Sequence, residues 1–474
     1  MGAAKKPRKE ILEAVSLFSR FRIDVLVISP AVEILQRIVQ VSERLKLTVH
    51  RVSNVSQYEK EFKEIGWPNL IILDLSVMKE KQLALETILA LKTMVPHSYY
   101  TALVKDGSDA EFCQQLKDAG MDHVQVIDEV LRSMKLDFLL MQQFLLQYYP
   151  IELRDLFPGT EITFNAFHFM ALNNKYLPVI FERFVLSDKK FKRLEKVSQI
   201  YIQSHALQAY QEYIESYYDS FNTGLQKRTK AAFLQLVYAY TQISGLLMNG
   251  EGSLNLEKNS EMLAQLLGFC ESRHTTLINY IKSSSEPFHN YIQMFQNHGL
   301  SSFDRSLFIA GLAAFLSEMS GVGQPGLILK SSLMACSGLI FSDQKTYLKW
   351  HDQLESQWSP EDRVHFSDAI KISGEIGRLN LADFRGPMAQ IVSHVFERFD
   401  GKGLPDKISG EKIPVETSVI QLADGWLRLI AKRPKMTATE SYESFKAYLS
   451  VEKKSGKINP AVIEKLEQVG FCKT

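Results

Sequence analysis

Short apolar runs alternate with helix-like periodic stretches over the first 150 residues of the chain. Each run is apolar throughout, as in strands that are buried on both faces of a parallel sheet. The pattern predicts five strands, near residues 24–28, 47–52, 70–73, 99–104 and 123–127. Helical periodicity separates them, and one long helix is expected over 129–148. Strands that alternate with helices in this way indicate an α/β domain of the doubly wound, flavodoxin-like kind.

The pattern changes near Pro150. Residues 149–220 combine short strand-like pieces with a helical stretch at 186–197, which predicts a small mixed α/β module. Residues 221–285 have helical periodicity and are interpreted as a helical connector. Four large apolar residues share one face of this stretch: Phe233, Leu236, Tyr240 and Ile243. That face predicts either packing within the chain or a dimer-forming helix.

The remainder of the chain, 286–474, again has helical periodicity, interrupted by polar loops at 321–326 and 400–413. A multidomain protein is therefore expected. Its predicted parts are a basic tail with a short helix (1–22), the flavodoxin-like domain (23–148), the mixed module (149–220), the helical connector (221–285) and an all-α domain (286–474).

Composition narrows the class of protein further. Of the 474 residues, 45% are hydrophobic, and 55 Lys and Arg nearly balance 54 Asp and Glu. This balance gives no electrostatic basis for a nucleic-acid binder. No run of 18 or more apolar residues occurs, so no membrane span is expected. The chain has four cysteines far apart in sequence: Cys113, Cys270, Cys336 and Cys472. They are expected to be reduced thiols of a cytoplasmic protein.

Two short motifs stand out in the flavodoxin-like domain. The third apolar run ends on Asp74, and Ala119-Gly120-Met121-Asp122 precedes the fifth. Together they resemble the receiver domain of bacterial two-component response regulators, over about residues 23–148. The resemblance implies that Asp74 occupies the position of the phospho-acceptor aspartate.

The resemblance also implies that the phosphorylation chemistry is lost. Receivers hold Mg²⁺ with an acidic pair after the first strand, because this ion prefers carboxylate oxygens. Here that pair is Ser29-Pro30, and the family's phosphate-binding lysine aligns with Ile127-Asp128. The family's hydroxyl aligns near Val104-Lys105. Asp74 is therefore interpreted as a vestigial phospho-acceptor in a pseudo-receiver, with pairing to Lys105 or phosphorylation as alternatives.

A longer motif lies near the C-terminus. It comprises Glu397-Arg398-Phe399-Asp400-Gly401-Lys402-Gly403-Leu404-Pro405, then Gly410-Glu411-Lys412-Ile413-Pro414, Ala423-Asp424 and Arg433-Pro434. This string resembles the HD-GYP family, whose active members hydrolyse cyclic di-GMP. The family has His-His-Glu-x-x-Asp-Gly-x-Gly-Tyr-Pro, Gly-Glu-x-Ile-Pro, Ala-Asp and Arg-Pro-Tyr at these spacings. The resemblance implies that residues 286–474 form an all-α HD-GYP-like domain.

In active members of the family, histidines and carboxylates hold two or three metal ions that activate water. The aligned histidine positions here carry residues that cannot replace an imidazole: Ser317, Ala369, Val395 and Phe396. Only Glu318 and Asp424 keep a ligand type, so we expect vestigial carboxylates, no metal and no catalytic residue. Two alternatives are a lone Mg²⁺ or Ca²⁺ on these carboxylates and a register shift that makes His394 a ligand. Val395 and Phe396 are expected to be mostly buried and to fill the former metal cavity.

The predicted function is a non-catalytic bacterial signalling adaptor that joins a pseudo-receiver to a pseudo-HD-GYP domain and acts through contacts with protein partners. The alternatives are a cyclic di-GMP-binding effector without hydrolysis and an active cyclic di-GMP phosphodiesterase. Leu404 replaces the tyrosine of the family motif, so it either contacts a partner or packs under its loop. Arg398, Lys402 and Arg433 are further candidate contacts for a partner or a nucleotide. No cofactor is expected, and a homodimer is an alternative that the resemblance implies.

Overall fold

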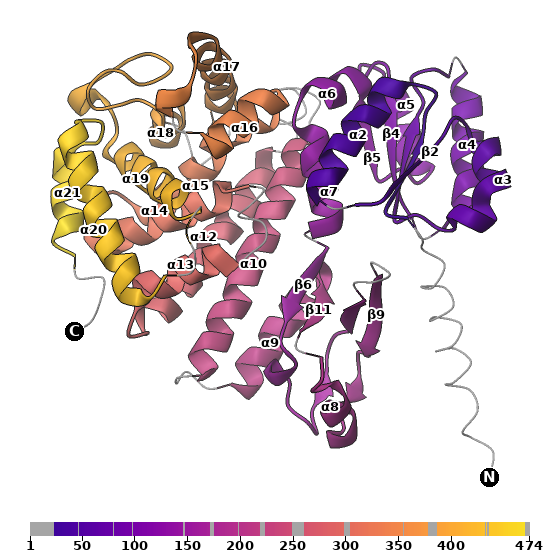
Figure 1. Cartoon of the computed structure of the whole chain (residues 1–474), viewed down its shortest axis with the longest axis horizontal. Coiled ribbons are helices and arrows are strands. Elements are labelled where there is room, and N and C mark those ends of the chain that lie inside the picture. The colour runs from indigo at the N-terminus through magenta and orange to yellow at the C-terminus, as the bar shows by residue number, and fades with distance from the viewer. Residues whose placement is uncertain are drawn as a thin grey trace. The chain divides into compact units, whose positions relative to one another are not determined.

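The computed structural model describes residues 23–469, apart from 46, 79, 97, 146, 171–174, 198, 219–222, 249–259, 298–303, 354, 378–385, 432, 434 and 435 (Figure 1). The predicted tail and helix at 1–22, Cys472 and Pro434 therefore lie outside the described residues. The chain divides into two compact units between Ala209 and Tyr210.

The first unit begins with a five-stranded parallel sheet, as the apolar runs predict. Its strands are β1 (Val25–Ile28), β2 (Val49–Val52), β3 (Leu70–Asp74), β4 (Tyr99–Val104) and β5 (His123–Val126). Their order, β2-β1-β3-β4-β5, is one of the two common orders of doubly wound sheets. The order of the strands reverses at β1, because β2 lies on one side of it and β3, β4 and β5 lie on the other. The carboxyl ends of β1 and β3 are therefore adjacent at one edge of the sheet.

Helices cover both faces of this sheet, which explains why the strands are apolar at every position. The helices are α2 (Val32–Leu45), α3 (Val55–Ile65), α4 (Lys81–Met94), α5 (Ala110–Asp118), α6 (Ile127–Arg132) and α7 (Lys135–Leu145). Neighbouring residues of β1 serve opposite faces: Leu26 packs with α3, α4 and α5, and Val27 packs with α2, α6 and α7.

The single helix predicted over 129–148 is wrong, because it breaks at Ser133. This residue is extended (φ −103°, ψ 178°) and separates α6 from α7. Its hydroxyl donates to the Glu129 carbonyl at 2.6 Å and accepts from the Lys135 amide at 3.3 Å. A serine side chain that bonds the backbone in this way competes with the helical hydrogen bonds.

A small antiparallel sheet completes the first unit. Its strands are β6 (Tyr148–Ile151), β8 (Ala166–Met170), β9 (Lys175–Ile180) and β11 (Ile200–Gln203), in the order β6-β11-β8-β9. A two-residue strand, β7 (Glu161–Ile162), pairs with β10 (Phe184–Val185). The predicted helix at 186–197 is the shorter α8 (Asp188–Leu194), and α9 (Leu207–Tyr217) follows β11.

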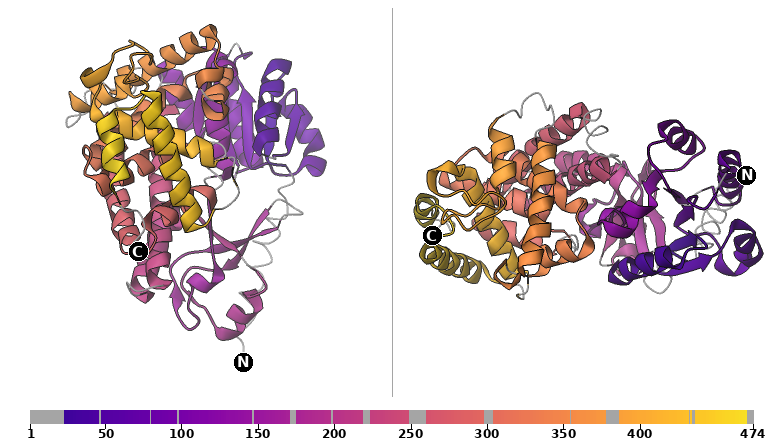
Figure 2. Two further views of the ribbon diagram at one scale, coloured as in Figure 1. Left: turned by 60° about the vertical axis from the view of Figure 1, so that its left-hand side comes forward. Right: turned by 90° about the horizontal axis from the view of Figure 1, so that it is seen from above.

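The described part of the second unit consists of helices joined by loops (Figures 1 and 2). The helices are α10 (Thr223–Met248), α12 (Ser260–Lys282), α13 (Pro287–Asn297), α14 (Ser306–Ser320), α15 (Pro325–Ala335), α16 (Gln344–Asp352), α17 (Pro360–Gly377), α18 (Pro387–His394), α19 (Val415–Ile430), α20 (Ala438–Ser455) and α21 (Pro460–Glu467). Helix α14 is buried without a break from Ser306 to Ser317 and lies at the core.

Helix α10 is the most apolar long helix. Its stretch Gly224–Met248 is long enough to cross a membrane and contains an 18-residue window with a mean hydropathy of 1.2, but 78% of that window is buried within the structure. The four apolar residues that share its predicted face are all buried, and the ring of Phe233 packs against Phe308 at 6.0 Å between centroids. This face therefore packs within the chain, which is one of the two alternatives that its spacing allows.

Candidate functional site

A cavity of about 540 Å³ opens in the second unit at the position of the long C-terminal motif. Its walls come from α16, α19, α20 and the loop that follows α18. The lining includes six of the residues singled out from the sequence: Val395, Phe396, Arg398, Leu404, Asp424 and Arg433. The expectation that large apolar side chains fill this space is therefore wrong.

The wall formed by Val395 and Phe396 explains why the space stays open. Val395 is buried, with 1% of its surface exposed, and Phe396 is half-buried. The Phe396 ring packs edge-to-face on Phe366 at 4.9 Å, and Phe366 packs in turn on Trp358 at 4.6 Å. Phe396 thus joins an aromatic wall of the cavity instead of crossing it, and Val395 is a buried part of the same lining.

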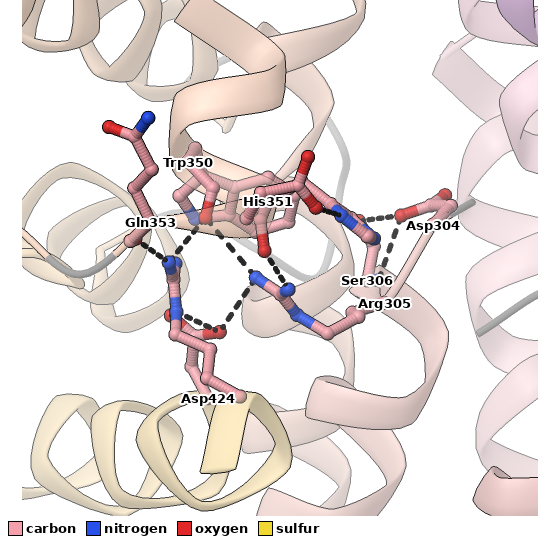
Figure 3. A network of polar contacts seen from close by, with 9 residues as sticks. Asp304, Arg305, Ser306, Trp350, His351, Gln353 and Asp424 are labelled. Atoms are coloured by element: carbon pink, nitrogen blue, oxygen red, sulfur yellow. Dashed lines mark hydrogen bonds and ion pairs between the residues drawn. The ribbon is translucent and has the colours of Figure 1, made fainter. Parts of the chain in front are cut away.

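Asp424 lies on α19, one helical turn before Arg428, and the two side chains form an ion pair. The Nε of Arg428 is 3.1 Å from both carboxylate oxygens of Asp424, and Nη2 is 2.9 Å from Oδ2. Arg305, the residue before α14, brings Nη2 to 3.6 Å from Oδ1. Two guanidinium groups therefore surround the carboxylate that the resemblance identifies as a former metal ligand (Figure 3).

Backbone carbonyls at the end of α16 hold both guanidinium groups in place. Arg428 donates to the carbonyls of Trp350 and Gln353, and Arg305 donates to those of Trp350 and His351. Both groups also lie over the Trp350 ring, as in cation–π contacts. The distance from the ring centroid is 5.1 Å for the guanidinium of Arg305 and 5.6 Å for that of Arg428. Burial alone would raise the pKa of Asp424, but the charges of Arg428 and Arg305 outweigh burial and hold the pKa below its usual value.

Asp304, next to Arg305, extends the network away from the cavity. Its carboxylate accepts from the amide of Ser306 at 2.9 Å, from the Ser306 hydroxyl at 2.7 Å and from the hydroxyl of Tyr240 on α10. The bond to the Ser306 amide satisfies one of the backbone donors in the first turn of α14 that have no partner within the helix. The network therefore fixes the start of α14 as well as Asp424.

The other residues aligned with metal ligands do not line the cavity. Ser317 is buried at the end of α14, and its hydroxyl donates to the Val322 carbonyl at 2.6 Å. The neighbouring Glu318 points to α12, where it pairs with Lys282. Ala369 on α17 is buried against η5 (Ser337–Ile340). Its carbonyl oxygen lies so close to Gly338 that a Cβ added to this glycine would be only 2.2 Å away. Of the aligned carboxylates, only Asp424 therefore faces the cavity.

Glu397 organises the loop that carries the motif. It is completely buried, and its Oε1 accepts the backbone N–H groups of Asp406 at 2.5 Å and Lys407 at 2.9 Å. Burial raises the pKa of this carboxyl group, although the two backbone donors act in the opposite direction. A Cβ added to Gly403 would lie 2.2 Å from the backbone nitrogen of Arg398, so glycine is required where the loop crosses itself. These motif residues serve the fold of the loop.

The remaining motif residues divide between the cavity and solvent. Leu404 is half-buried and lines the cavity, and its contact with a partner stays a prediction. Arg398 pairs with Asp400. Arg433 is exposed and its Nη1 donates to the Ser444 hydroxyl on α20. Lys402 is exposed on the loop and is not among the described residues that line the cavity.

Asp74 lies in the first unit, at the end of β3, and is 2% exposed. Its Oδ2 accepts the hydroxyl of Ser29 at 2.7 Å, and Oδ1 accepts the amide of Ser76 at 3.0 Å. The receiver resemblance aligns Ser29 with an acidic residue of that family, and here a neutral hydroxyl donor faces the aspartate. Lys105 is exposed, and no bond between it and Asp74 occurs in the described structure.

Sequence reasoning missed Arg305, Arg428 and Trp350, which control the chemistry of the site. The spacing of Asp424 and Arg428, four residues apart on a predicted helix, is a signal for an ion pair. Nothing in the sequence links Arg305 or Trp350 to Asp424. Among the residues described, no group of three or more His, Cys, Asp or Glu side chains could hold a metal ion.

Comparison with known proteins bears on the second unit. The family model described as the HD domain matches residues 333–462. No curated protein matches the chain. Among solved structures, the chain is similar to Bd1817, a HDG"Y"P protein from Bdellovibrio bacteriovorus, with 18% identity, a TM-score of 0.43, and coverage of 68% of this chain and 98% of that one. The cavity and the Asp424 network lie largely within the matched range, and the C-terminal helical unit therefore contains an HD domain.

Proposed function

We propose that this protein is a non-catalytic signalling protein in which a degenerate HD-GYP domain is joined to a pseudo-receiver. The observation that carries this proposal is the ion pair of Asp424 with Arg428, with Arg305 nearby. A metal ion would have to displace two positive charges from this carboxylate. It would find no imidazole at the aligned positions 317, 369, 395 and 396 to compensate.

The first unit supports the same proposal. Transfer of phosphate to Asp74 needs Mg²⁺ beside the carboxylate, and the neighbouring Ser29 offers a hydroxyl in place of a carboxylate. The Ser29 hydroxyl also occupies one lone pair of the would-be nucleophile. A pseudo-receiver of this kind acts by contact with other proteins, and we propose that the chain is a cytoplasmic adaptor.

A second candidate function is a cyclic di-GMP effector that binds without hydrolysis. The open cavity favours it, because Arg398 and Arg433 lie on its walls and could meet phosphate groups. An active phosphodiesterase is disfavoured by the neutralised Asp424.

The deciding experiment measures turnover and binding separately on the full-length protein. We expect no hydrolysis of cyclic di-GMP with added Mn²⁺ or Fe²⁺, and no stoichiometric transition metal by elemental analysis, with an active HD-GYP phosphodiesterase as the positive control. Calorimetric titration with cyclic di-GMP then separates the adaptor from the effector. Metal-dependent turnover that disappears in Asp424→Asn would refute the proposal.

A further inference from the structure

The cavity has a mostly apolar lining that is unusual for a site of phosphate chemistry. Helix α20 presents a stripe at helical spacing, Ala447, Tyr448 and Val451, and α19 presents Ile420 and Leu429. Val451 and Leu429 are 62% and 38% exposed, so apolar side chains also reach the opening. A pocket of this size and polarity is typical of small-molecule sites that hold an apolar ligand body.

The charged residues of the lining fall into two groups. Four of them are neutralised in ion pairs: Arg428 and Asp424 pair with each other, Arg398 pairs with Asp400, and Glu355 pairs with Arg363. The other charged lining residues, Arg433, Lys457 and Glu452, have no ion-pair partner within the described structure. Two unpaired cations against one unpaired carboxylate leave the lining with a net charge of one positive unit.

Lys457 is held in place by its backbone. It follows Gly456, which ends α20 in the left-handed conformation (φ 69°), and its carbonyl accepts the Phe399 amide at 2.7 Å. Its amide donates to the Ser455 hydroxyl at 3.2 Å. Lys457 is half-buried, and its backbone is fixed beside the motif loop before any ligand arrives.

We propose that the cavity binds an amphipathic organic anion, with its apolar body along the stripe of α20 and its acidic head at Lys457. This inference rests on the proposed non-catalytic function and deepens it by naming a ligand class. A fatty acid or a comparable organic acid matches the lining. Its carboxylate neutralises the net positive charge of the lining, while its alkyl chain covers Leu429 and Val451. Such a ligand would make the HD domain a sensor of a metabolite rather than an enzyme.

The test compares dodecanoate with dodecanol, which has the same apolar body without the charge, by calorimetry on the full-length protein. We expect dodecanoate to bind about tenfold more tightly than dodecanol, as a charge-assisted hydrogen bond would give. Lys457→Gln should remove this preference, and Glu452→Gln should increase it. Lys454→Gln is the matched control, because Lys454 is exposed near the end of α20 outside the lining, and it should leave the preference unchanged.

A blocking variant checks the location. Ala447 is exposed, so Ala447→Phe fills the cavity without disturbing the core, and it should abolish binding of both probes. Equal affinity for the two probes, no binding to the natural chain, or full binding by Ala447→Phe would each overturn the inference. Hydrolysis of cyclic di-GMP would instead refute the non-catalytic function, and it would leave the dodecanoate preference unaffected.

Discussion

The guanidinium of Arg428 holds both carboxylate oxygens of Asp424 at 3.1 Å through Nε, from one helical turn further along α19. Both side chains are largely buried, 13% and 16% exposed. In such a setting the loss of one partner leaves an uncompensated charge, and this costs more than the pair contributes. The pair is therefore a structural element of the HD domain and can be tested as one.

Arg428→Met should strongly destabilise the second unit. It leaves Asp424 with Arg305 alone and leaves the carbonyls of Trp350 and Gln353 without this donor. We expect the free energy of unfolding to fall by about 3–5 kcal/mol, measured by urea denaturation. The double variant with Asp424→Asn should recover part of that loss. Lys453→Met breaks an exposed ion pair with Glu467 and is the control; a similar loss in this control would contradict the prediction.

The stability of the second unit should depend on Asp424 at acid pH. The folded-state pKa of this carboxyl group is lowered, so its stabilising contribution is present above the unfolded-state pKa, about 4, and is lost as the pH falls through the folded-state value. The free energy of unfolding of the natural chain should therefore rise with pH in the range below about 4. Asp424→Asn should flatten this rise in a series of denaturation curves. Identical slopes of the unfolding free energy against pH for the natural chain and the Asp424→Asn variant would contradict this prediction.

Small-molecule phosphodonors with Mg²⁺ should leave Asp74 unmodified, because Ser29 cannot help to hold the ion and instead donates to the aspartate. Intact-mass analysis after incubation with acetyl phosphate checks this, and a phosphorylatable response regulator is the control. A stable added phosphate that maps to Asp74 would show that the first unit is a working receiver.

Restoring histidines at 395 and 396 should reveal two different environments. Val395→His places a polar ring at a buried site and should cost about 2–4 kcal/mol of unfolding free energy. Phe396→His should cost less, because Phe396 is half-buried at the open cavity. Thermal and chemical denaturation of the two single variants give the comparison. Neither variant should hydrolyse cyclic di-GMP; equal costs would mean that the two sites do not differ as described.

The sequence predicts the elements that are buried on both faces and misses the features that depend on side-chain packing. The runs at β1 and β3 are apolar at every position because helices cover both faces of the sheet, so their pattern is unambiguous. The break at Ser133 depends on one hydroxyl, and no periodicity detects it. Likewise, the identities of Val395 and Phe396 suggest a filled cavity, but the Phe396 ring packs on Phe366 and leaves the space open.

The carboxylate of Glu397, which accepts two backbone N–H groups, separates the architecture of the motif from its chemistry. This glutamate and Gly403 are needed to close the loop, whichever residues stand at the aligned histidine positions. A search that scores these two positions therefore detects the fold of the loop and carries no information about a metal site. The residue one helical turn after the aspartate carries different information, because Arg428 at this position pairs with the Asp424 carboxylate.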